Sequence, residues 1–210
     1  QKEIQKLANA NGIHVVSWWW TPGALATKTS PVGGPDTVKG QKLRAADPTF
    51  ESMLKAAGAS TSAMASTEIY PALQSGVLTG ALTSAETFVS GRLYEQTKHA
   101  TVGGANSLWM LLQPLVMSKQ HWDKLSPKQQ KIFEEAADKA DAFFLTVQRE
   151  ATNAMAEAWR KSGGTPREMT DDEYKQWMDL ARKTAYPEYA AISPTAKRIL
   201  DALEKSKAAK

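Results

Sequence analysis

The chain has 210 residues, of which 42% are hydrophobic and 23% charged, a composition typical of a globular protein that buries one large core or two smaller ones. Its formal net charge of +4 does not indicate nucleic-acid binding, because five basic and two acidic side chains lie in the C-terminal segment 195–210, expected to be a solvated helix end, and no run interleaves arginines with aromatic residues. The absence of cysteine excludes disulfides and cysteine-ligated zinc, and no apolar run approaches the ~20 residues that span a bilayer, so the chain is not expected to cross a membrane.

The first elements in chain order alternate between helix and strand. Residues 1–11 resemble the end of a helix, which Gly12 stops in a left-handed cap. The β-branched and aromatic run 13–19 predicts a buried strand. The proline-rich and glycine-rich segment 20–35 predicts a loop or irregular crossover.

An α/β pattern continues through the middle of the chain. Residues 42–45 are predicted to form a strand, followed by a helix over 48–57 with Pro48 in its first turn and Gly58 beyond its end. A further helix over 66–75 is expected to be capped by Ser66 or Thr67. Further strands are predicted at 61–64, 77–80, 99–103 and 108–117. Helices that alternate with short apolar strands indicate an α/β sheet.

The second half of the chain is predicted to be helical. Ser126 and Gln129 form a capping box around Pro127, and no helix breaker follows until Gly163. Apolar residues between them recur at spacings of three and four, so one stripe runs along a helix on the order of 50 Å long. That length exceeds what one small lobe can cover. The later helices are expected to begin at Thr170 with Glu173 and at Ser193 with Pro194.

Catalytic and metal-binding patterns are not evident. The histidines lie far apart in sequence, at His14, His99 and His121. The chain has no GxSxG elbow, GxGxxG fingerprint or phosphate-binding GxxxxGK[ST] loop. Adjacent acidic pairs do not face each other on a helix, so converging catalytic carboxylates are not indicated.

Two features suit ligand binding. Arg44 stands near the end of the predicted strand 42–45, and its guanidinium offers paired donors that match a carboxylate, although most arginines are solvated surface residues. In the run Trp18–Trp20, a strand places Trp18 and Trp20 on one face and Trp19 on the other. One of them is expected in the core, while another could stack on a ligand at the strand's end.

Four sequence blocks in order resemble the substrate-binding proteins of TRAP transporters, the tripartite ATP-independent periplasmic uptake systems. The blocks are KGQKLR at 39–44, GAS at 58–60, EIYPALQSG at 68–76 and TG at 79–80, where the family usually has DG. The likeness continues through WDKLSPKQQKIFEEAA at 122–137. It implies an α/β, periplasmic-binding-protein-like, two-lobed clamshell of the class II type, with a long interlobe helix, truncated so that the signal peptide and most of the first lobe are missing.

The resemblance also implies a division of the chain. Four segments are expected: residues 1–20 as the end of a first-lobe helix and a hinge strand, 21–106 as the ligand-binding second lobe, 107–148 as a returning strand and spine helix, and 149–210 as helices packing back on the second lobe. Apolar surface that a complete first lobe would cover is then expected to be exposed.

The implied function is that of a periplasmic carrier without enzymatic activity, cofactor or bound metal. It would capture a small organic acid between its lobes and deliver it to the integral membrane permease subunits. Arg44 matches the family arginine that clamps the ligand carboxylate. The remaining predicted ligand contacts are Trp19, Trp20, Ser66, Thr83, Ser84 and Trp109.

Some positions depart from the family pattern. Thr83 stands where many members carry asparagine, Ser66 where an aromatic side chain often packs on the ligand, and Leu25 is nearest to a second arginine that is missing. These departures argue against the sugar-acid specificity of some members. A clamshell-fold enzyme or a ligand-sensing domain is the alternative function. A weaker alternative is a helical interaction module.

Overall fold

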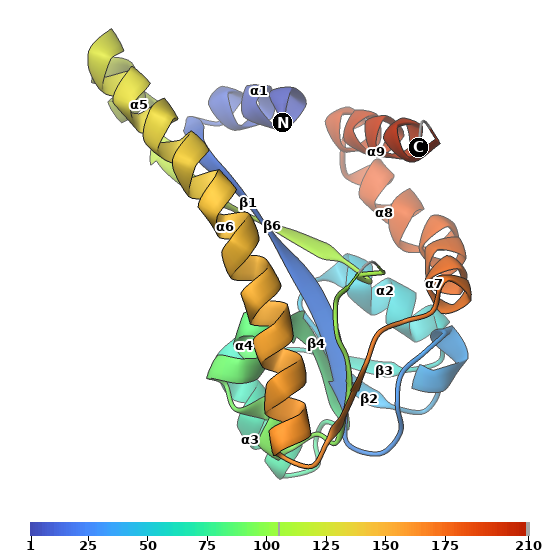
Figure 1. Ribbon diagram of the computed structural model, residues 1–210. Coiled ribbons are helices and arrows are strands. Elements are labelled where there is room, and N and C mark those ends of the chain that lie inside the picture. Colours follow the sequence, from blue (N-terminus) through green and yellow to red (C-terminus); the bar gives the residue numbers. More distant parts are fainter. Residues whose placement is uncertain (105, 209–210) are drawn as a thin grey trace. The chain divides into compact units, whose positions relative to one another are not determined.

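The computed structural model describes residues 1–104 and 106–208, so the last two residues of the basic segment 195–210 lie outside it (Figure 1). The chain divides into two compact units. Unit 1 comprises residues 1–20, 112–148 and 189–210, and unit 2 comprises 21–111 and 149–188. The elements that belong to both units are β1 (Ile13–Thr27), β6 (Met110–Ser118), α6 (Pro127–Lys161) and α8 (Ala185–Ile192).

Helices and strands alternate through unit 2, as the sequence predicts. The other helices are α1 (Lys2–Ala10), α2 (Pro48–Ala56), α3 (Ile69–Gln74), α4 (Ala85–Ser90), α5 (Lys119–Lys124), α7 (Asp171–Lys183) and α9 (Pro194–Ala208). The other strands are β2 (Lys42–Ala45), β3 (Ser60–Ala63), β4 (Gly80–Ser84), β5 (His99–Thr101) and β7 (Thr165–Arg167). Short 3-10 turns are η1 (Pro35–Val38), η2 (Ser66–Glu68) and η3 (Leu93–Glu95).

The strands form a mixed sheet in the order β3-β2-β4-β1-β5-β7, and β6 also pairs with β1. Strand β2 is parallel to both β3 and β4, whereas β1 is antiparallel to β4 and β5. The carboxyl ends of β2, β3 and β4 therefore lie at one edge of the sheet, the place where open α/β sheets bind ligands.

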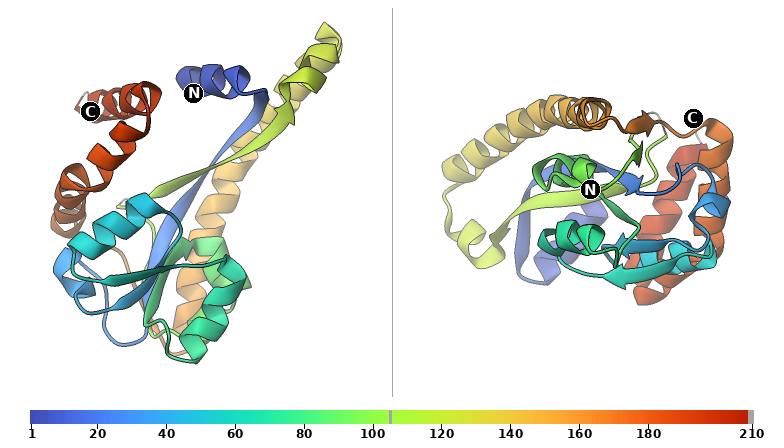
Figure 2. Two further views of the ribbon diagram at one scale, coloured as in Figure 1. Left: turned by 180° about the vertical axis from the view of Figure 1, so that it is seen from behind. Right: turned by 90° about the horizontal axis from the view of Figure 1, so that it is seen from below.

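Alternation along the strands sends side chains to two cores, one on each face of the sheet in unit 2. Ala26 and Ala81 pack in a cluster with α3, α4 and the C-terminal half of α6. Leu25 and Leu82 pack in a second cluster with α2 and α7. Figure 2 shows α3 and α4 grouped beside the C-terminal half of α6. Both faces of this sheet are thus covered by helices.

Unit 1 buries much less apolar surface. Its buried apolar residues in the described part of the chain are Val15, Trp122, Ala137 and Ala196. Large apolar side chains of the same unit are exposed, among them Leu115, Val116, Ile132, Phe143 and Leu145. Hydrophobic burial, which dominates folding free energy, is therefore concentrated in unit 2.

Specific contacts join β1 to α6 within unit 1. The Ser17 hydroxyl donates to a carboxylate oxygen of Asp141, and the Trp18 backbone N–H lies 3.2 Å from both oxygens of that carboxylate. One turn further along α6, Phe144 stacks on Trp19 with ring centroids 4.9 Å apart. Strand β1 is thus joined to α6 by hydrogen bonds to the Asp141 carboxylate and by a stacked aromatic pair.

Several predicted boundaries are confirmed. Strand β2 and helix α2 begin and end within one residue of the prediction, and α7 begins one residue after the predicted Thr170. The Ser126 N–H donates to the Gln129 side chain at 2.9 Å, so the start of α6 has the expected cap. Thr170 and Glu173 cap α7 reciprocally. None of the helices in the described residues has the length and apolar character needed to cross a bilayer.

The predicted loop over 20–35 is wrong in its first part, because β1 continues to Thr27. Pro22 is tolerated on the side of β4 because the ladder with β4 begins only at Gly23, so β4 does not need the missing N–H. The strand expected at 77–80 begins at Gly80 instead. The expected cap from Ser66 or Thr67 is also wrong, because residues 66–68 form η2 without a side-chain bond from either residue.

Candidate functional site

Arg44 lies at the carboxyl end of β2, between the parallel strands β3 and β4. Its side chain is 8% exposed. The guanidinium binds two backbone carbonyls that lie just beyond the paired parts of the neighbouring strands. Its Nε and Nη2 donate to the Met64 oxygen at 3.1 and 3.0 Å, and its Nη1 donates to the Leu82 oxygen at 3.0 Å.

The donor count leaves part of the guanidinium open. An arginine has five N–H groups, and three of those of Arg44 point at carbonyl oxygens. One N–H therefore remains on each terminal nitrogen. A parallel pair of this kind is the arrangement that binds both oxygens of a carboxylate.

The charge of Arg44 is not neutralised by contact with an acid. Among the described residues no carboxylate lies within ion-pair distance of its guanidinium, whose protein partners are neutral carbonyls. Burial lowers the pKa of the Arg44 guanidinium, yet an arginine stays protonated in proteins. A buried, uncompensated cation favours an anionic ligand.

Thr83 lies on the same face of the sheet as Arg44. Arg44 pairs with Ala81 in the β2–β4 register, and Thr83 follows two residues later on β4, where side chains repeat on one face. Thr83 is 6% exposed, and its hydroxyl has no hydrogen-bond partner among the described residues. Ser66 lies in η2, just beyond the end of β3, and is exposed.

Ser84 and Trp109 lie on the opposite face. Ser84 pairs with Gly23, and its hydroxyl accepts from the Thr87 N–H at 3.2 Å as the N-cap of α4. The Trp109 indole covers Gly23 and lies 5.3 Å from the ring of Phe50. Arg44 and Thr83 thus share one face at the carboxyl edge, near the turn that carries Ser66, while Ser84 and Trp109 have packing partners on the other face.

The two predicted tryptophans of β1 belong to unit 1. Trp19 stacks on Phe144, and its indole nitrogen is buried without a partner in the described part of the protein. Trp20 is 37% exposed, so its ring is open to contact. The ligand roles predicted for both stay predictions.

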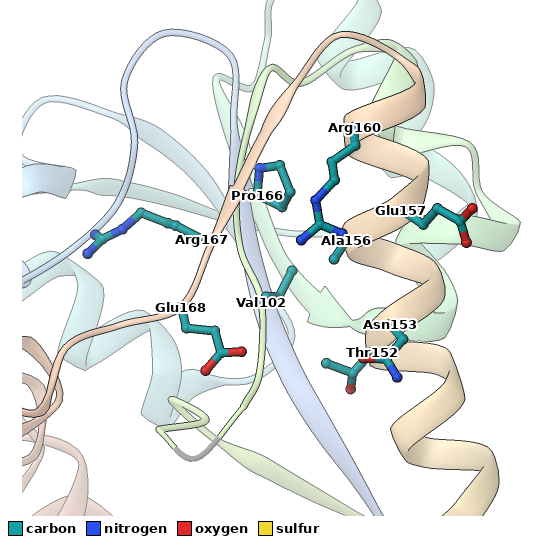
Figure 3. A pocket seen from close by; sticks show the side chains of 9 residues that line it. All are labelled: Val102, Thr152, Asn153, Ala156, Glu157, Arg160, Pro166, Arg167 and Glu168. Atoms are coloured by element: carbon teal, nitrogen blue, oxygen red, sulfur yellow. The ribbon is translucent and has the colours of Figure 1, made fainter.

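One hollow in unit 2 lies away from Arg44. It has a volume of about 510 Å³ and is formed by the C-terminal half of α6 with β5 and β7, as the side chains in Figure 3 show. Two of its charged residues are already paired, Arg167 with Glu173 at 2.6 Å and Glu157 with Lys161 at 2.7 Å. Its remaining charged side chains are exposed, so we take Arg44, a buried cation that lacks an anion, as the candidate site.

Metal ligation finds no support in residues 1–104 and 106–208, which contain no group of three or more acids and histidines able to hold an ion. Burial lowers the pKa of His14, with Lys119 adding to the effect, and burial also lowers the pKa of His99. Neither histidine contacts Arg44.

The family model for bacterial extracellular solute-binding protein, family 7, matches residues 1–191. The chain belongs to this family. The resemblance read from KGQKLR and EIYPALQSG is thereby confirmed. Members of the family are extracellular solute-binding proteins.

Curated relatives agree with this assignment. A solute-binding protein of Albidiferax ferrireducens is 33% identical over 198 residues, which cover 94% of this chain and 59% of the relative. The C4-dicarboxylate-binding periplasmic protein of Rhodobacter capsulatus is 27% identical over 181 residues, or 85% of this chain and 54% of that protein. The chain therefore spans little more than half the length of these relatives.

Solved structures confirm the predicted α/β fold of periplasmic solute-binding proteins. A TRAP periplasmic solute-binding protein from Rhodoferax ferrireducens with bound malonate superposes with a TM-score of 0.92 at 32% identity, covering 99% of this chain and 66% of that one. A TRAP periplasmic solute-binding protein from Chromohalobacter salexigens with bound D-glucuronate has a TM-score of 0.83 at 22% identity. The match covers 98% of this chain and 68% of that one. The second likeness concerns the fold alone.

The carbonyl groups of Met64 and Leu82 were not predicted from sequence. Every residue has a backbone carbonyl, so its use in a site leaves no sequence signal. Only the order β3-β2-β4 shows that both carbonyls lie beside Arg44.

Proposed function

We propose that this chain is the ligand-capturing part of a periplasmic TRAP solute-binding protein that takes up a small organic acid. The observation that carries the proposal is the Arg44 guanidinium, which is buried, bound to neutral carbonyls and left with one N–H on each terminal nitrogen. A carboxylate completes this arrangement in charge and in hydrogen bonding.

A short dicarboxylate is the ligand class that we favour. The family relative from Rhodoferax ferrireducens was solved with malonate. Here the unpartnered Thr83 hydroxyl lies on the same sheet face as Arg44 and adds a donor and an acceptor. Ser66 is proposed to shape the remainder of the site in unit 2, with Ser84 and Trp109 on the opposite face of the sheet, and the ligand roles of Trp19 and Trp20 in unit 1 stay predictions. The chain then acts as a carrier for the membrane permease subunits and not as an enzyme.

The test is a calorimetric titration of malonate and longer organic acids into the natural polypeptide carrying this chain. Arg44→Ala is expected to weaken malonate binding by about 100-fold or more, because two charge-assisted hydrogen bonds are lost. Arg44→Lys keeps the charge but not the paired donors, so it is expected to restore only a small part of the affinity. The control is Arg149→Ala, at an exposed position of α6.

Arg44 also satisfies two carbonyls, so its replacement can weaken the fold. The Arg44 guanidinium signals in an NMR titration of the unaltered protein provide a second measurement. They are expected to shift as malonate binds. The proposal would be refuted if folded Arg44→Ala bound malonate with the affinity of the unaltered protein. It would also be refuted if the Arg44 signals did not shift at saturating malonate.

A further inference from the structure

One peptide group beside Arg44 is held from both sides. The carbonyl of the Met64–Ala65 peptide accepts from Arg44 Nε and Nη2. The N–H of the same peptide donates to Glu68 Oε2 at 2.8 Å. A peptide group is planar, so its C=O and N–H turn together. The orientation of the carbonyl that holds Arg44 therefore depends on Glu68.

Glu68 also closes the turn that follows β3. Its backbone N–H donates to the Ala65 oxygen at 3.0 Å, while its side chain returns to the Ala65 N–H. Neither Ser66 nor Thr67 caps this turn with its side chain. The position of the Met64 carbonyl at the edge of the sheet is thus set by a reciprocal pair of bonds between residues 65 and 68.

Glu68 is bonded to the Met64–Ala65 peptide and not to Arg44 itself, and this indirect contact is compatible with an anion-binding site at Arg44. A carboxylate bonded directly to Arg44 would occupy the donors that a ligand needs. Glu68 instead accepts from an N–H whose own carbonyl binds the guanidinium, and hydrogen bonds in such a chain polarise one another. The negative charge therefore strengthens the Met64 acceptor while the two remaining N–H groups of Arg44 stay open.

We propose that Glu68 is a positioning residue for the Arg44 guanidinium, acting through the Met64–Ala65 peptide. This inference rests on the proposed function of Arg44 as the carboxylate clamp. It assigns a role to the acidic residue that opens the EIYPALQSG block. Glu68 and Ala65 are exposed, and solvent screens such interactions, so the effect on affinity is moderate.

The experiment compares Glu68→Ala and Glu68→Gln in the natural polypeptide by NMR of the Arg44 Nε–H and by malonate calorimetry. Glu68→Ala is expected to move the Nε–H signal toward that of a solvated arginine and to weaken malonate binding about threefold to tenfold. Glu68→Gln retains an acceptor for the Ala65 N–H without the charge, so the Arg44 Nε–H signal and the malonate affinity are expected to lie between those of Glu68→Ala and the unaltered protein. The control is Gln129→Ala, which removes a similar bond to the Ser126 N–H in unit 1.

The outcomes separate this inference from the proposed function. An unmoved Arg44 signal in Glu68→Ala overturns the inference, even where thermal stability falls, because Glu68 then only stabilises the turn. Malonate binding that requires Arg44 but is indifferent to Glu68 also overturns it and leaves the proposed function standing. An Arg44 signal that responds to Glu68→Ala in a protein that binds no organic acid supports the positioning role and refutes the proposed function.

Discussion

Gly23, which lies inside β1 and pairs with Ser84 at the end of β4, tests how tightly the sheet is packed at this point. A Cβ at this position would lie 1.7 Å from Trp109 Cε2 and 2.1 Å from Cδ2 and Nε1 of the same indole. The Gly23 N–H also donates to the Trp109 oxygen at 2.9 Å, so the strand and the indole cannot easily separate. Gly23→Ala is therefore expected to displace a side chain that is only 8% exposed.

The magnitude follows from the overlap. Ordinary contact begins near 3.4 Å, so the Trp109 indole or the backbone has to move by roughly 1.7 Å. Overpacking of a core costs about 1–3 kcal/mol, and full exposure of an indole of about 200 Å² would cost about 5 kcal/mol. We expect Gly23→Ala to lower the free energy of unfolding by about 3 kcal/mol, between these values.

Urea denaturation followed by circular dichroism measures this loss. Trp109→Leu makes room for the methyl group, so Gly23→Ala/Trp109→Leu is expected to be as stable as Trp109→Leu alone, which corresponds to a coupling energy of about 3 kcal/mol. Gly103→Ala is the matched control, because its nearest neighbours lie 3.3 Å from the added Cβ. A Gly23→Ala protein within about 0.5 kcal/mol of the unaltered one would refute the reasoning.

Two further predictions concern unit 1. Asp141→Ala leaves the Trp18 N–H without its acceptor, so that amide is expected to exchange with solvent at least about tenfold faster, a loss of about 1.4 kcal/mol; unchanged exchange would contradict the role of Asp141. The pKa of His14 is lowered below 6.5 by burial and by Lys119, so the unfolded chain binds the proton first. The contribution of His14 to stability is therefore present above pH 6.5 and lost on acidification. His14→Phe, which keeps the ring stack on Trp122, is expected to make the free energy of unfolding depend less on pH. An unchanged pH dependence would refute this role of His14.

Local chemistry explains why several elements were predictable. The start of α6 is specified by Ser126, Pro127 and Gln129, and the start of α7 by Thr170 and Glu173, because a helix cap uses side chains within four residues of one another. The strand that carries Arg44 was predicted with its correct bounds. The sequence blocks around it were sufficient to indicate the family.

The course of β1 shows the limit of local prediction. Pro22 and Gly23 indicate a loop by composition, yet both lie inside a strand of 15 residues. Pro22 is accepted because the ladder with β4 begins only at Gly23, and Gly23 is needed because an indole from residue 109 covers it. Both reasons depend on residues more than sixty positions away, so no sequence window contains them.

The sequence by itself determined where α6 and α7 begin, indicated the family and singled out Arg44 as the candidate for binding a carboxylate. The tertiary structure decided how Arg44 is held and which predicted residues share its face. Parallel pairing of β2 with β3 and β4 brings the Met64 and Leu82 carbonyls to the guanidinium. Backbone groups are the same in every residue, so only the order and register of the strands specify which of them meet.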